Sequence, residues 1–205
     1  MGLKMIFRND KDTMIVFDSE TTGLLQPDGC KLEKQPYVIE IYAAKINSKF
    51  KIVDEFESLV KAPVPISEFI TELTGITQQM LDGTEGLEET HPLYFPKAPE
   101  FIEIYDDLCN FWEGSHAMCA HNLMFDFSML KNELKRHELN YKFPWPKEWV
   151  CTVEASFAIN NRRMKLATLY KTATGKTMLD SHRAKADVLP TIESLQYLVE
   201  EGLVI

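Results

Sequence analysis

The segment MIVFDSETTG, residues 14–23, decides how the rest of the chain is interpreted. Its first four residues are apolar, which is typical of a short buried strand, and the Thr-Thr-Gly that closes it predicts a turn. Asp18 and Glu20 are two positions apart, so on an extended backbone both carboxylates project from the same face. The segment therefore predicts a buried strand that ends in two aligned acidic side chains.

Two aligned carboxylates at the end of an apolar strand repel each other and lose solvation, so a positive charge is expected beside them. A bound Mg²⁺ or Mn²⁺ ion would supply that charge. An acidic chain also contains such pairs by chance, and pairs with the same spacing occur at positions 10 and 12 and at 55 and 57. The spacing of Asp18 and Glu20 alone is therefore weak support for a metal site, and it is their place at the end of an apolar strand that strengthens the case.

The remaining pattern predicts an α/β fold, with a central mixed β-sheet flanked by α-helices. Segments 37–46 and 50–61 are rich in β-branched and aromatic residues and are separated by a plausible hairpin turn, and residues 116–120 form one more expected strand. Residues 82–99 carry several glycines and prolines and predict a long loop. Helices are expected at 67–73, 77–81, 98–112, 125–139, 153–159, 166–174 and 183–201.

Composition limits the class of protein. The 205 residues, 45% of them hydrophobic, fit one globular domain. The net charge of −9 argues against a protein that coats nucleic acid by bulk electrostatics. No apolar run approaches the roughly 18 residues needed to cross a bilayer, so we expect a cytoplasmic protein without membrane association. The four cysteines are scattered, so we expect reduced thiols and no zinc knot.

Further acidic residues stand where helices are expected to begin. Asp126 follows the strand at 116–120 and falls in the first turn of the next helix, where interaction with the helix dipole is its simplest role. Asp187 comes five residues after His182, and both can face one side near the start of the last helix. An exposed, solvated pair is the alternative interpretation of His182 and Asp187.

Three motifs resemble those of the DnaQ-like exonuclease family of the DEDDh type, which has a ribonuclease H-like fold. They are FDSETTGL at 17–24, HNLMFD at 121–126 and HRAKAD at 182–187. The resemblance extends to TGIT at 74–77, CTVE at 151–154 and LATLY at 166–170, and so covers most of residues 14–199. It implies a single exonuclease domain over residues 1–205, with the motifs within about 13–200.

The resemblance also implies the chemistry of the site. Asp18, Glu20, Asp126 and Asp187 would hold two divalent ions, Mg²⁺ or Mn²⁺, and His182 would act as the general base. The sister subtype has a tyrosine four residues before the last aspartate, where this chain has Arg183. The chain is therefore assigned to the histidine subtype.

The expected substrate is the 3' end of a nucleic acid. The resemblance implies contacts to the terminal nucleotide from the motif residues Thr21, Thr22, Gly23, Leu24 and Asn122. Phe127, directly after the second motif, is a further candidate contact. The glycine lets the main chain approach closely, and aromatic rings can stack on bases. A plain turn after the strand and packing of Phe127 in the core are the alternatives.

We expect a freestanding 3'-5' exonuclease that releases nucleoside monophosphates, with DNA, single-stranded or frayed at duplex ends, as the favoured substrate. An RNA exonuclease that trims tails or short oligomers is the alternative, and a catalytically silent binding module is the third hypothesis. The loop at 83–97 is longer than the connection usual in the family, and we expect it to form a lid, a substrate contact, or an interface with a second copy or another protein.

Overall fold

The computed structural model describes residues 6–178 and 182–204. Its strands are β1 (Thr13–Thr21), β2 (Val38–Asn47), β3 (Ile52–Leu59), β4 (Ala117–Ala120) and β5 (Glu148–Cys151). Its helices are α2 (Glu68–Thr74), α3 (Gln78–Asp82), α4 (Tyr105–Trp112), α5 (Leu123–Arg136), α6 (Thr152–Asn160), α7 (Leu166–Thr174) and α8 (Ala184–Glu200), and 3-10 turns cover Leu32–Lys34 and Phe101–Ile104.

The strands form one mixed sheet in the order β3-β2-β1-β4-β5. β1, β2 and β3 pair antiparallel, whereas β1 with β4 and β4 with β5 pair parallel. The α/β class and the mixed sheet expected from the sequence are confirmed. The sequence pattern missed β5, because this edge strand has only four residues, two of them exposed, and shows no alternation that could identify it.

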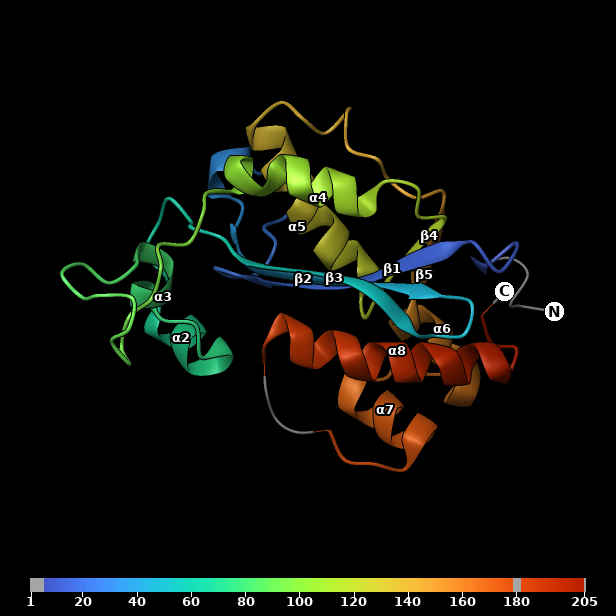
Figure 1. The fold of residues 1–205 in the computed structure, drawn as a ribbon. Coiled ribbons are helices and arrows are strands. Elements are labelled where there is room, and N and C mark those ends of the chain that lie inside the picture. The colour runs from blue at the N-terminus through green and yellow to red at the C-terminus, as the bar shows by residue number, and fades with distance from the viewer. Residues whose placement is uncertain (1–5, 179–181, 205) are drawn as a thin grey trace.

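Helices cover both faces of the sheet (Figure 1). Alternation along β1 determines what each face buries: Met14 and Val16 pack in the core beneath α7 and α8, while Ile15 and Phe17 pack in the core beneath α4 and α5. Asp18 and Glu20 continue the first of these two series. Their carboxylates therefore lie on the α8 face of the sheet, and Ser19 lies on the α5 face.

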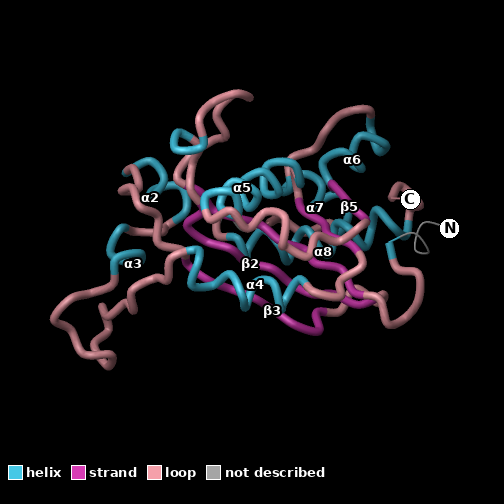
Figure 2. The backbone as a smooth tube through the Cα atoms, turned by 90° about the horizontal axis from the view of Figure 1, so that it is seen from above, coloured by secondary structure: helices cyan, strands magenta, loops and turns pink. Residues whose placement is uncertain are grey.

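α2, α3 and the loop that follows them form an excursion at one end of the sheet (Figures 1 and 2). Ser67 caps α2 through the backbone N–H of Ile70, as its sequence position predicts, and Thr77 caps α3 through that of Met80. A side chain at Gly83, where φ is 81°, would lie 2.8 Å from the backbone nitrogen of Lys97, so the base of the loop requires glycine.

The register between β1 and β4 determines where the sheet is open. β4 pairs with β1 only from Met14 to Val16, and the chain then leaves β4 through Asn122, at φ 74°, into α5. Within the described residues, the last part of β1 consequently has no strand beside it on that edge and faces the start of α5 instead. No described helix is long and apolar enough to cross a membrane.

Candidate functional site

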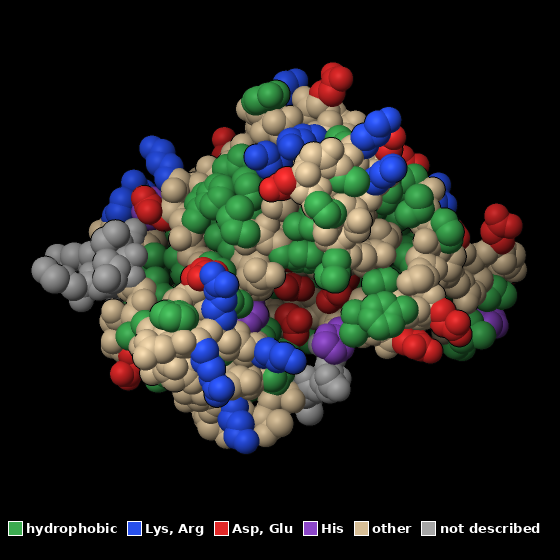
Figure 3. Space-filling view, turned by 180° about the vertical axis from the view of Figure 1, so that it is seen from behind, with side chains coloured by type: hydrophobic (Ala, Val, Ile, Leu, Met, Phe, Trp, Pro, Cys, Tyr) green, Lys and Arg blue, Asp and Glu red, His purple; other side chains and the backbone are tan. Residues whose placement is uncertain are grey.

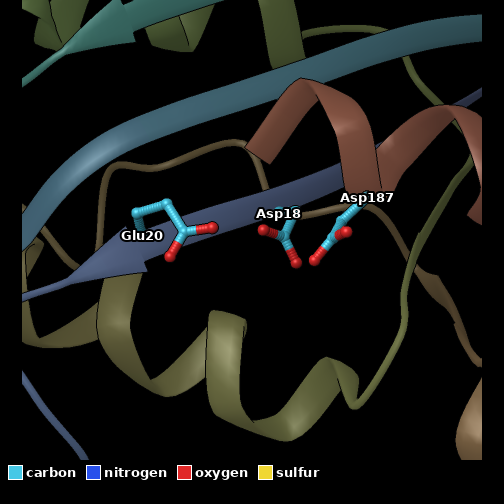
Figure 4. Close-up of side chains that lie close together, drawn as sticks. All are labelled: Asp18, Glu20 and Asp187. Carbon is cyan, nitrogen blue, oxygen red and sulfur yellow. The ribbon is translucent and has the colours of Figure 1, made fainter. Parts of the chain in front are cut away.

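Three carboxylates from two distant parts of the chain meet at the end of β1. Asp18 and Glu20 project from β1, and Asp187 projects toward them from the first turn of α8 (Figure 4). One oxygen from each of the three lies within 4.8 Å of the other two. The spacing argument for Asp18 and Glu20 therefore predicted their shared face correctly.

Asp126 reaches the same region from the opposite face of the sheet. It lies in the first turn of α5, as predicted, and is 2% exposed. One of its carboxylate oxygens accepts hydrogen bonds from the Ser19 backbone nitrogen at 3.1 Å and from the Ser19 hydroxyl at 2.8 Å. This N–H is available because β4 does not extend that far, so the open edge of β1 holds the Asp126 carboxylate in place.

The four carboxylates share a crowded, poorly solvated space. Burial, reinforced by the other carboxylates, raises the pKa of Asp18 well above its usual value and that of Glu20 to about 8. Burial also raises the pKa of Asp126 to about 7 and that of Asp187 to about 6. Asp18 and Glu20 in particular resist ionisation at neutral pH, so the four carboxylates form a site that a cation would stabilise.

His182 lies two residues before α8 and is exposed. In its positive form it lowers the pKa of Asp187, against the effect of burial, so the imidazole lies near this carboxylate. The predicted base therefore stands at the solvent side of the acidic group. This position allows it to exchange protons with water.

An ion pair that the sequence analysis did not identify fixes the start of α8. Glu40, 2% exposed, lies opposite Glu20 in the register of β1 with β2. Its carboxylate accepts hydrogen bonds from the Arg183 guanidinium, with Nε at 2.9 and 3.0 Å from the two oxygens, and from the Ala184 backbone nitrogen at 3.0 Å. A single acidic residue within the apolar run VIEIYAA, residues 38–44, was the signal available, because a buried charge requires a partner.

A pocket of about 400 Å³ adjoins Glu20, and we call it the apolar pocket. Its walls come from the turn after β1, from α2 and from the first turn of α5, and they include Leu24, Phe69, Leu73 and Phe125. Leu24 is 78%, Phe69 67% and Leu73 40% exposed, so three large apolar side chains gather at the solvent boundary of this pocket. Figure 3 shows acidic side chains in a hollow bordered by apolar ones, with basic side chains farther out.

The turn that lines the apolar pocket is held by its own hydrogen bonds. The Thr21 hydroxyl donates to the Gly23 carbonyl at 2.8 Å. The Thr22 backbone nitrogen donates to the Tyr37 carbonyl, and its hydroxyl accepts from the Tyr37 nitrogen. A side chain at Gly23 would meet no atom within 4 Å, so the face of this glycine is open to the pocket.

The other two predicted contact residues lie outside the apolar pocket. Asn122 is exposed at the turn into α5. Phe127 packs against Trp145 and Trp149, at 4.8 and 4.4 Å between ring centroids, and lines a different groove. Phe125 is the aromatic residue of α5 that lines the apolar pocket, and the helical pattern alone assigned it only to the helix.

Sequence comparison matches the chain to an exonuclease family and to described bacterial proteins. Residues 15–195 match the family described as Exonuclease. The DNA polymerase III PolC-type protein of Caldanaerobacter subterraneus subsp. tengcongensis is 34% identical over 189 residues, which are 91% of this chain and 12% of that protein. A Thermotoga maritima protein of the same description is 29% identical over 188 residues. The chain thus spans about one eighth of the length of these relatives.

Solved structures share the fold. The nuclease domain of 3'hExo, described as a DEDDh family member bound to rAMP, superposes with a TM-score of 0.72 at 17% identity, over 96% of this chain and 97% of that one. Exonuclease X in complex with 5' overhanging duplex DNA gives 0.59 at 22% identity, over 92% of both chains. With the family match over residues 15–195, these findings show that the chain belongs to the DnaQ-like (DEDDh) family of 3'-5' exonucleases, in the ribonuclease H-like superfamily.

Proposed function

We propose that this chain removes nucleotides from 3' ends with two divalent cations, Mg²⁺ or Mn²⁺, held by Asp18, Glu20, Asp126 and Asp187. The approach of Asp18, Glu20 and Asp187 within 4.8 Å is the observation that carries the proposal. Their donor set fits the cations, since hard divalent ions prefer carboxylate oxygens. The raised pKa values fit as well, because such a group is stabilised by added positive charge.

When bound, a pair of cations supplies an acidified water and charge stabilisation for the leaving 3' oxygen. The chain's own residues position the donors. Ser19 orients Asp126 with two hydrogen bonds, and Glu40 holds the segment from which Asp187 projects. In the proposed mechanism His182, which is exposed and lies near Asp187, takes the proton from the attacking water and releases it to solvent.

The apolar pocket is the proposed site of the terminal nucleotide. Exposed Leu24 and Phe69 offer apolar contact to a base or sugar, while Glu20 on the same pocket leaves the adjoining phosphate beside the cations. Gly23 allows close approach of the ligand to the main chain. Apolar and aromatic contacts of this kind do not distinguish one base from another, so we propose a nuclease without base specificity.

DNA is the proposed substrate, because the relatives that cover most of this chain are described as DNA polymerase III. RNA is the alternative substrate. The loop at 83–97 presents Leu93, which is 63% exposed. Docking of a second copy or of another protein on this loop stays a prediction.

The test uses 5'-labelled single-stranded DNA, duplex DNA and RNA, incubated with Mg²⁺ or Mn²⁺ and with a chelator as control. We expect stepwise shortening from the 3' end that the chelator abolishes and that Asp18→Asn, which preserves side-chain size, also abolishes. If no substrate is shortened, or if Asp18→Asn retains full activity, the proposed function is wrong.

His182→Ala separates the proposed base from the proposed ligands. It should retain metal binding, measured by calorimetry, and lose about 10²-fold to 10⁴-fold in turnover. A loss of metal affinity as large as that of Asp187→Asn would contradict the assignment of His182 as the base.

A further inference from the structure

A second groove, of about 430 Å³, runs along the exposed side of α5, and we call it the α5 groove. Met124, Phe127, Lys131 and Lys135 line it from the helix at spacings of three and four residues, which place them on one face. The opposite face of α5 is buried in the core. The segment from Leu25 to Gln35 supplies the other wall.

The α5 groove adjoins the apolar pocket. Leu24 lines the pocket and Leu25 the groove, and in the first turn of α5 Phe125 lines the pocket and Met124 the groove. The pocket and the groove thus border the same two segments of the chain, so a strand that leaves the pocket along α5 can continue into the groove. This proximity distinguishes the groove from an unrelated surface depression.

The chemistry of the groove changes along the helix. Met124, 57% exposed, comes first, followed by Phe127, whose ring is supported by two tryptophans. Lys131 follows with its Nζ 5.3 Å from the centre of the Phe127 ring, and Lys135 is the last. Apolar and aromatic groups followed by lysines are the combination that binds the bases and phosphates of a single strand.

The two lysines are available for an anion. Neither Lys131 nor Lys135 forms an ion pair with a described residue, although the chain has a net charge of −9. Asp28 is the acidic residue among those lining the groove, and it offsets part of their charge. Positive charge retained beside the proposed active site of an acidic protein is complementary to a polyanion.

We propose that the α5 groove holds the substrate strand upstream of the nucleotide being removed, with Met124 and Phe127 against bases and Lys131 and Lys135 on phosphates. The inference rests on the proposed exonuclease function. Lys135 is nine positions after Asp126, a rise of about 13.5 Å at 1.5 Å per residue. At about 3.4 Å per stacked nucleotide, the lysines meet phosphates about two to four nucleotides from the 3' end.

The double variant Lys131→Gln/Lys135→Gln tests this length dependence. Lys49→Gln/Lys51→Gln is the matched control, since it removes the same charge from the turn beside Asn47, which pairs with Thr13 at the far end of β1. For single-stranded DNA of about twelve nucleotides, we expect the double variant to raise KM about tenfold and to reduce the slope of log affinity against log salt by about 1.4. Its kcat/KM on a dinucleotide should be unchanged, and the control should match the unmodified chain on both.

Three results would overturn the inference: an equal loss of affinity for short and long strands, no loss for either, or an effect on duplex substrates alone. The last of these would place the complementary strand in the groove. The fluorescence anisotropy of a 5'-labelled strand measures binding in the groove without turnover. Weaker binding of this strand by the lysine variant therefore supports the groove even where no substrate is cut. Cleavage by the unmodified chain with unchanged anisotropy in the variant refutes the groove alone.

Discussion

Asp126→Asn should make the metal-free protein more stable at pH 8. Asparagine keeps the size of the side chain and one carbonyl oxygen, which can still accept both hydrogen bonds from Ser19. What it removes is a carboxylate that is 2% exposed and whose pKa burial raises from 3.8 to about 7. The variant therefore removes the unfavourable ionisation and preserves the local packing.

The size of the effect follows from the pKa shift. A shift of about three units at about 1.4 kcal/mol each amounts to as much as about 4 kcal/mol at pH 8, where the group is ionised in both states. Because the folded pKa lies above the unfolded one, folding takes up a proton between them. The stabilisation from the protonated form is present below pH 4 and is lost as the pH rises through about 7, so at pH 5 the variant should gain less than about 2 kcal/mol.

Urea unfolding in a chelator at pH 5 and pH 8 measures the difference. The unmodified protein should itself be less stable at pH 8, since Glu20 and Asp187, with pKa values of about 8 and 6, titrate in the same direction. Added Mg²⁺ should restore about 2.7 kcal/mol at one hundred times its Kd, and less in the variant. If the metal-free Asp126→Asn protein is less stable than the unmodified one at pH 8, burial of the ionised Asp126 carboxylate does not destabilise the fold.

Three other substitutions test the elements around the site. Glu40→Gln removes the charge that holds the partly exposed Arg183, so urea unfolding should show a loss of about 1 to 3 kcal/mol in the free energy of unfolding. The variant should lower kcat and leave KM less affected, and an unchanged kcat would contradict a positioning role for Glu40. Gly23→Ala places a methyl group in open space, so thermal denaturation should be unchanged while KM rises severalfold; a lower Tm would mean that the turn itself requires glycine. Phe69→Ala should raise KM with little change in stability, since its ring is exposed, and an unaltered KM would remove α2 from the substrate pocket.

Local sequence patterns predicted the elements that carry their own signals. The helix expected at 166–174 has those bounds in the structure, because Gly175 ends it in the left-handed conformation. The helix expected at 125–139 runs from Leu123 to Arg136, so its position is correct and its ends are displaced. Capping and periodicity thus locate helices well, and ends without a strong cap less well.

The site depends on contacts that no local pattern contains. Glu40 and Arg183 are 143 residues apart, and Ser19 and Asp126 are 107 apart. Two residues of β1 could be paired by strand geometry, but Asp126, His182 and Asp187 came from the family resemblance. Phe125 and Phe127 show the same limit, since only the packing of α5 determines which ring lines the apolar pocket.

The ionised carboxylates of the site could be stabilised by helix dipoles or by bound cations, and the pKa values distinguish between these two sources. Asp126 and Asp187 both lie in the first turn of a helix, where the dipole favours a negative charge by about 0.3 to 1 kcal/mol. Burial opposes this with the larger effect, since it holds the pKa of Asp126 about three units above its usual value. The helix dipoles therefore offset only part of the cost that burial imposes on these acids. Asp18, with a pKa well above its usual value, and Glu20, with a pKa of about 8, resist ionisation at neutral pH. Bound divalent cations would favour their ionised forms, and this is the physical reason to expect a metal-dependent enzyme.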